Sequence, residues 1–127
     1  MQKIPVISIV DDDEAVRLAL RSLVRSLGYV SNVFSSAEEF LESALLNETS
    51  CLISDVQMPG MNGIELQKRL KVMDCSAPVI FVTAFPDERS RACALAAGAI
   101  GFLEKPFEGR AMVQLIETAL RAQREQA

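Results

Sequence analysis

The sequence has 127 residues, of which 50% are hydrophobic, and this size and composition suit one compact domain with a sizeable core. It contains no histidine, which excludes Ser-His-Asp and Cys-His catalytic arrangements and the common zinc sites built with histidine. Its formal net charge of −4 makes the chain by itself a poor candidate for binding nucleic acid.

Short apolar runs alternate five times with longer segments that have helical periodicity. Continuous apolar runs of this kind are typical of strands buried on both faces of a parallel sheet. They predict strands at residues 6–10, 29–34, 51–54, 79–82 and 100–103. The segments between them predict helices at residues 14–27, 37–45, 63–73 and 87–97, and from residue 108 to beyond residue 120.

Several residues mark the expected ends and faces of these helices. Gly28 and Gly98 follow the first and fourth helices, and glycine readily adopts the left-handed conformation that ends a helix. Ser36 and Glu39 have the spacing of a capping box at the start of the second helix. The third helix is expected to carry Met73 on its apolar face.

Five strand–helix units imply an α/β fold, a doubly wound parallel sheet with helices on both faces. Right-handed crossovers restrict the topology, and the chain length favours the flavodoxin-like (βα)5 arrangement with strand order 2-1-3-4-5. In this order the connections change direction between the first and third strands. A binding site is expected there, at the carboxyl ends of the strands.

Polar side chains follow four of the predicted strands. Asp11 and Asp12 follow the first strand, Asp55 the third, Thr83 the fourth, and Lys105 lies just past the fifth. Taken singly, each residue has an ordinary explanation as a helix cap, a turn residue or a solvated side chain. Their joint placement at one edge of the sheet is much harder to explain in that way and predicts a site.

Three carboxylates close together require a positive counter-charge. Oxygen ligands without histidine or thiolate favour a hard cation, Mg²⁺ first, and the backbone carbonyl of Gln57 is well placed to add a ligand. Such a site invites a phosphoryl group. Asp55 would attack it as the nucleophile, while Lys105 would share its negative charge and the Thr83 hydroxyl would donate a hydrogen bond.

The cysteine and hydropathy patterns indicate a soluble cytoplasmic protein. The three cysteines, Cys51, Cys75 and Cys93, are odd in number and lack CxxC spacing, so we expect reduced thiols and no zinc site. The apolar run at residues 4–10 is too short for the core of a signal peptide. No segment approaches the roughly 20 apolar residues that span a bilayer.

Four motifs together resemble the receiver domains of two-component response regulators, and the resemblance covers essentially the whole chain. The motifs are Val10-Asp11-Asp12, Asp55 with Met58-Pro59-Gly60-Met61-Asn62-Gly63, Val82-Thr83-Ala84, and Lys105-Pro106-Phe107. Their combination is highly specific. The segment Ser-Ser-Ala-Glu-Glu-Phe-Leu at residues 35–41 and the pair at residues 98–99 resemble the FixJ-type branch, whose members usually carry a C-terminal helix-turn-helix domain.

The resemblance implies a role for each matching acidic-site residue. Asp55 is the expected phospho-acceptor and also contacts the metal. Asp12 is expected to bind Mg²⁺ directly, and Asp11 through water. Gln57 is expected to contribute its backbone carbonyl to the metal. Gln57 also lies two residues after Asp55, at a position that influences phosphoryl lifetime in receivers, as does Phe85 two residues after Thr83.

The resemblance also implies how the signal would spread. Lys105 and Thr83 are expected to contact the phosphoryl group, and the bond between Lys105 and Pro106 is expected to be cis. Phosphorylation would draw Thr83 toward the phosphoryl group and turn Phe102 inward. The surface of the fourth helix, fifth strand and fifth helix would then change and form a homodimer.

The expected function is therefore a phosphorylation-activated switch rather than a classical enzyme. A partner sensor histidine kinase would supply the phosphoryl group, and the chain would catalyse only its own phosphorylation and dephosphorylation. Residues 1–127 would form one receiver domain. DNA would be bound only through an output domain outside this sequence, and no membrane contact is expected. We expect this receiver to be part of a longer transcriptional regulator.

Three other functions remain open from the residues alone. A haloacid-dehalogenase-like phosphatase also uses an aspartate nucleophile and Mg²⁺, but it would want a second aspartate where Gln57 stands. A flavodoxin-type cofactor module would suffer repulsion between its phosphate and the acidic run at residues 11–13. A metal-independent pseudo-receiver that only binds proteins would not need the complete set of aspartate, threonine and lysine residues.

Overall fold

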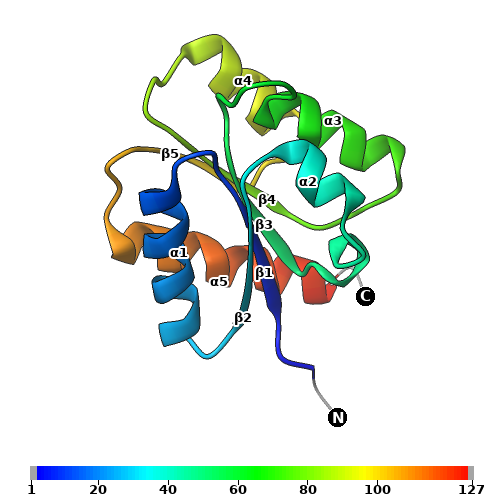
Figure 1. Ribbon diagram of the computed structural model, residues 1–127, viewed down its shortest axis with the longest axis vertical. Coiled ribbons are helices and arrows are strands. Elements are labelled where there is room, and N and C mark those ends of the chain that lie inside the picture. The colour runs from blue at the N-terminus through cyan, green and yellow to red at the C-terminus, as the bar shows by residue number, and fades with distance from the viewer. Residues whose placement is uncertain (1–2, 126–127) are drawn as a thin grey trace.

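A computed structural model describes residues 3–125 and contains a five-stranded parallel sheet (Figure 1). The strand order is β2-β1-β3-β4-β5, as the sequence predicts. The strands are β1 (Val6–Val10), β2 (Val30–Phe34), β3 (Cys51–Asp55), β4 (Val79–Thr83) and β5 (Gly101–Glu104). The second and fifth strands each begin one residue later than the apolar runs indicate.

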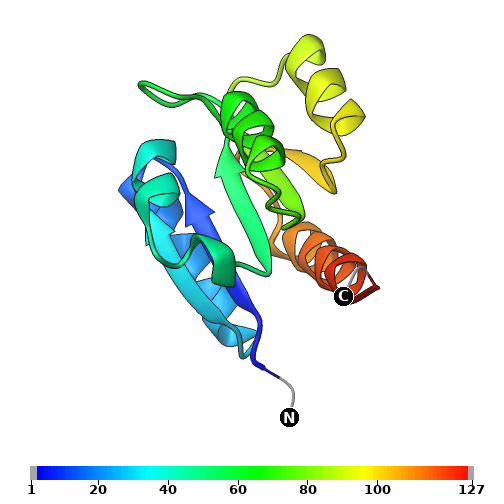
Figure 2. The same cartoon turned by 90° about the vertical axis from the view of Figure 1, so that its right-hand side faces the viewer.

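Helices cover both faces of this sheet. Helices α1 and α5 lie on one face and α2, α3 and α4 on the other (Figures 1 and 2). Their bounds are α1 (Glu14–Ser26), α2 (Ala37–Glu42), α3 (Gly63–Val72), α4 (Glu88–Ala96) and α5 (Gly109–Glu125), with a short 3-10 turn η1 (Leu46–Glu48) after α2. Within residues 3–125, no helix is both long and apolar enough to cross a membrane.

The central strands β3 and β4 are buried along their whole length. Successive side chains of a strand point to opposite faces, so each strand supplies both cores. Ile53 and Ile80 pack beneath α1 and α5, whereas Leu52 and Phe81 pack beneath α2, α3 and α4. Burial on both faces explains why these strands have continuous apolar runs instead of alternating apolar and polar residues.

The predicted capping box of α2 forms only in part. The Ser36 hydroxyl accepts a hydrogen bond from the Glu39 N–H at 3.1 Å, as a cap should. The Glu39 carboxylate accepts instead from the Ser35 hydroxyl at 3.0 Å. The complete reciprocal box is at α3, where Asn62 caps the Glu65 N–H and the Glu65 side chain returns to Asn62.

Several helix ends differ from the prediction by one residue or more, and two of these differences change the role of a residue. Helix α2 ends at Glu42 because Ser43 adopts an extended conformation, and its hydroxyl accepts a hydrogen bond from the Leu45 N–H. The predicted helical positions up to Leu45 are therefore wrong. Met73 caps the C-terminus of α3 and is 46% exposed, so its assignment to the apolar face is also wrong. Gly28 and Gly98 end α1 and α4 at positive φ, as predicted.

The start of α3 packs so tightly against the end of β3 that Gly63 has no room for a side chain. A Cβ at Gly63 would lie 2.2 Å from the Asp55 carbonyl oxygen and 3.0 Å from the Phe81 ring. We expect Gly63→Ala to lower the free energy of unfolding, measured with urea, by about 1–3 kcal/mol. Gly109→Ala is the control, since a Cβ there meets nothing within 4 Å. Equal stability of the two variants would contradict this packing.

Candidate functional site

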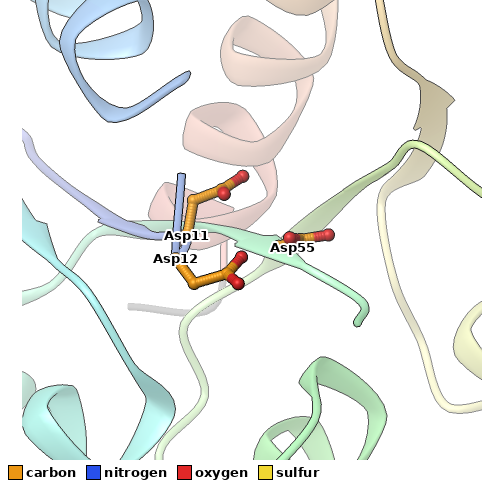
Figure 3. Close-up of side chains that lie close together, drawn as sticks. All are labelled: Asp11, Asp12 and Asp55. Carbon is orange, nitrogen blue, oxygen red and sulfur yellow. The ribbon is translucent and has the colours of Figure 1, made fainter. Parts of the chain in front are cut away.

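Three carboxylates meet at the carboxyl edge of the sheet. The strand order places β1 beside β3, with Val10 opposite Ser54, so Asp11, the residue after Val10, neighbours Asp55, the residue after Ser54. Asp11 and Asp12 therefore lie beside Asp55, and both carboxylates turn to the side on which Asp55 lies (Figure 3). One oxygen from each of the three carboxylates lies within 4.8 Å of the others. The predicted convergence is observed.

Lys105 brings a positive charge into this acidic group from beyond β5. Its Nζ lies 2.9 Å from Asp11 Oδ2 and 3.3 Å from Asp55 Oδ2. The side chains of both aspartates are almost fully buried, and that of Lys105 is 16% exposed. The peptide bond between Lys105 and Pro106 is cis, as the sequence resemblance implies. One ammonium thus bridges the two buried carboxylates.

The electrostatic balance of the site remains negative. Burial and the charge of Asp11 raise the pKa of Asp55 to about 6, although Lys105 partly offsets them. Burial lowers the pKa of Lys105, but its contacts with Asp11 and Asp55 outweigh burial and leave that pKa raised. Lys105 therefore stays charged at neutral pH. A single ammonium beside three carboxylates leaves room for a further cation.

The raised pKa of Asp55 predicts a pH-dependent stability in the absence of metal. The folded state binds this proton more tightly than the unfolded state, so its stabilising effect is present at low pH and is lost as pH rises through about 6. We expect Asp55→Asn to raise the melting temperature at pH 8 in EDTA, because it removes a buried charge. The gain should vanish near pH 4. A variant less stable than the wild type at pH 8 would contradict the prediction.

Two further residues predicted to act at this site are Thr83 and Gln57. Thr83 is buried at the end of β4, where its hydroxyl oxygen accepts a hydrogen bond from the Phe85 N–H at 3.1 Å. A hydroxyl that accepts one hydrogen bond still has a proton that it can donate. Gln57 is exposed, and its N–H contacts Asp55 Oδ1 at 3.4 Å. These positions agree with the predicted arrangement.

Phe102 does not join the acidic cluster. It lies on β5, half-buried, with its ring centroid 6.2 Å from that of Phe81. It packs against the core beneath α2, α3 and α4. Any influence of the site on Phe102 has to pass through the packing between them.

Two contacts at this edge were not found by sequence reasoning. Arg17 Nη1 donates a hydrogen bond to the Asp11 carbonyl oxygen at 2.7 Å, which ties α1 to the end of β1. The Glu38 carboxylate accepts one from the Met61 N–H at 2.9 Å. The sequence signal for Arg17 is weak: a basic residue on the first turn of an otherwise acidic helix start.

A match to a protein-family model identifies the family of the chain that carries this site. The model of the response regulator receiver domain matches residues 7–117, which include every residue of the cluster. The chain belongs to the response-regulator receiver family. This assignment takes the place of the phosphatase and cofactor-module alternatives. Receiver domains act in two-component signalling, where they partner with sensor kinases and often have DNA-binding output domains.

Individual relatives place this receiver near the FixJ-type regulators. It is 39% identical to the transcriptional regulatory protein FixJ of Bradyrhizobium diazoefficiens over 91% of this chain and 56% of that protein. It is 42% identical to the response regulator protein TodT of Pseudomonas putida over 91% of this chain and 51% of that protein. The receiver thus spans about half the length of these curated relatives.

Solved structures of relatives have the same fold. The response regulator StyR superposes with a TM-score of 0.90 at 42% identity, covering 98% of this chain and 63% of that chain. FixJ-N superposes with a TM-score of 0.83 at 35% identity, covering 95% of this receiver and 96% of that chain. The flavodoxin-like order predicted from the sequence is therefore the order of this family.

Receiver domains generally use Mg²⁺, and the donors at this site suit that ion. Each candidate ligand is an oxygen, which hard cations prefer. Asp12 is exposed whereas Asp11 and Asp55 are buried, so an ion beside Asp12 could keep part of its water shell. The surplus negative charge of the receiver's acidic cluster favours a divalent cation.

Proposed function

We propose that this receiver accepts a phosphoryl group on Asp55 from a partner sensor histidine kinase in a Mg²⁺-dependent reaction. The observation that carries the proposal is the position of the Asp55 carboxylate, which lies beside Asp11 and Asp12 and 3.3 Å from the Lys105 ammonium. With a pKa of about 6, Asp55 is mostly ionised at neutral pH and can act as a nucleophile.

Each neighbour has a distinct task in this proposal. Asp12 and Asp55 bind Mg²⁺ directly, Asp11 binds it through water, and the Gln57 backbone carbonyl completes the protein ligands. When bound, Mg²⁺ supplies positive charge to the phosphoryl oxygens. The Lys105 ammonium donates to a phosphoryl oxygen and stabilises the charge that develops during transfer.

The proposed switch runs from Thr83 to the surface formed by α4, β5 and α5. The Thr83 hydroxyl turns to donate to the phosphoryl group, and Phe102 moves inward. Helix α4 is well suited to shift, because Ala94 is its one buried residue and few apolar contacts hold it. The changed surface then pairs with a second copy and controls an output in the cytoplasm, with DNA bound only through an output domain.

Dimerisation has a direct test. Beryllofluoride with Mg²⁺ stands in for the phosphoryl group, so we expect it to move this receiver from the monomer to the dimer volume in gel filtration. Asp55→Asn should elute at one volume with and without beryllofluoride. Identical elution of the wild type under both conditions would contradict the proposed dimer.

The phosphorylation itself is tested with a small-molecule donor. Incubation with acetyl phosphate and Mg²⁺ should add one phosphoryl group to the intact mass, and excess EDTA should abolish the addition. Phosphoramidate serves as a second donor of different chemistry. A protein that gains no mass with either donor in Mg²⁺, or gains it equally in EDTA, would overturn the proposal.

A further inference from the structure

The carboxylate of Glu38 reaches from α2 to the loop that follows Asp55. Glu38 Oε2 accepts a hydrogen bond from the Met61 N–H at 2.9 Å, although the two residues are 23 positions apart. The same oxygen would lie 2.6 Å from a Cβ at Gly60, so only a glycine lets the carboxylate come this close. Gly60 also has a φ of +78°, which glycine adopts most easily.

This loop, residues 56–62, is tethered at both ends. The Val56 N–H donates to Val82 of β4, and the Val56 carbonyl accepts from the Gly63 N–H at 2.8 Å. Asn62 joins the capping box of α3. Between these ends, residues 57–61 make two hydrogen bonds to other elements of the described chain: a long one of 3.4 Å from the Gln57 N–H to Asp55 of β3, and the shorter one from the Met61 N–H to Glu38 of α2.

The segment that contains α2 runs past both parts of the chain that supply the acidic site. It connects β2 to β3, which lie on either side of β1 in the sheet. At the end of β2, just before this segment, the Phe34 carbonyl accepts a hydrogen bond from the Asp11 N–H at 3.1 Å. One turn further, Glu38 holds Met61. The segment from Phe34 to Glu38 therefore connects the backbone of Asp11 to the loop that carries Gln57.

We propose that Glu38 is a positioning residue for the metal site: its hydrogen bond to Met61 holds the loop in the form that presents the Gln57 carbonyl to Mg²⁺. The inference rests on the proposed function, because it assumes that Gln57 is a ligand. Glu38 is ionised when it does this, since the Met61 N–H lowers the pKa of its carboxyl. Hydrogen bonds to charged acceptors are the stronger kind.

Three variants distinguish anchoring of the loop by Glu38 from a general effect of its negative charge on Mg²⁺ binding. Glu38→Ala removes the acceptor and the charge, whereas Glu38→Gln removes the charge but keeps an oxygen acceptor. Glu42→Ala removes an equal charge from the exposed end of the same helix. Mg²⁺ affinity is measured by calorimetry, and the melting temperature without metal is measured in parallel to control for folding.

Anchoring predicts an unequal response of the three variants. Glu38→Ala should weaken Mg²⁺ binding by about tenfold, the low end for residues that support a metal ligand. Glu38→Gln should stay within about twofold of the wild type, because it retains an acceptor. Glu42→Ala should bind like the wild type. Equal weakening in both Glu38 variants, or none in Glu38→Ala, would overturn the proposal.

A second measurement does not depend on metal binding. In EDTA, amide hydrogen exchange at Met61 should accelerate in Glu38→Ala but not in Glu42→Ala, since the first variant alone frees the loop. Unchanged exchange at Met61 would overturn the anchoring role even if Mg²⁺ affinity fell. Failure of the wild type itself to bind Mg²⁺ would instead overturn the proposed function, so the two failures are distinguishable.

Discussion

Asp12→Asn should weaken Mg²⁺ binding by at least about tenfold. Replacing a residue that only supports a metal ligand already lowers metal affinity by about that factor, and Asp12 is proposed to be a ligand itself. Asp12 is the exposed member of the acidic cluster, so its replacement leaves the buried ion pairs of Lys105 intact. The melting temperature without metal should therefore stay close to that of the wild type. Calorimetric titration of the metal-free receiver with Mg²⁺ measures the effect.

The neighbouring residue provides a matched control. Asp13 caps α1 by accepting a hydrogen bond from the Ala15 N–H at 2.9 Å, and asparagine preserves this cap. Asp13→Asn removes one negative charge next to the site but no proposed ligand. It should bind Mg²⁺ within about threefold of the wild type, since exposed charges interact weakly through solvent. Similar losses in both variants would show that Asp12 acts through charge alone.

Lys105→Met should slow phosphorylation of the receiver by about 10²–10³-fold, the usual cost of removing one group that stabilises developing negative charge. The substitution also removes the charge that lowers the pKa of Asp55, so that pKa rises further above 6 and less nucleophile is ionised at pH 7. Both effects lower the rate of phosphorylation at pH 7. Initial rates of mass gain with acetyl phosphate, taken across pH 5.5–9, separate them.

The pH profile identifies which effect dominates. If ionisation of Asp55 matters, the midpoint of the rate profile should move to higher pH in Lys105→Met, and a large deficit should persist at pH 9 from the lost charge stabilisation. Lys68→Met, on the exposed face of α3, is the control and should behave like the wild type. A rate within about threefold of the wild type in Lys105→Met would contradict the role of Lys105.

The strand order and the clustered aspartates followed from simple patterns in the sequence. Apolar runs identify buried parallel strands, and the carboxyl ends of such strands share one edge, so Asp11, Asp12, Asp55 and Lys105 could be placed together without coordinates. Their proximity depends on topology alone. For this reason the prediction of the site tolerated errors of one residue in the bounds of several strands.

The contacts of Glu38 and the end of α2 could not be predicted in the same way. Glu38 meets Met61 only because α2 crosses from β2 to β3, and no local pattern links two residues 23 positions apart. The helix stops at Glu42, where the Ser43 hydroxyl accepts a hydrogen bond from the Leu45 N–H. Such a local side-chain bond to the backbone competes with the helix, and the spacing of apolar residues does not reveal it.

The location of the phosphoryl group tests the central claim most directly. The receiver is incubated with acetyl phosphate and Mg²⁺, the acyl phosphate is reduced with borohydride, and the modified residue is found by tandem mass spectrometry of the peptides. We predict modification at Asp55 alone in the wild type and none in Asp55→Asn. Modification at another residue of the wild type, or undiminished modification of Asp55→Asn, would contradict the account.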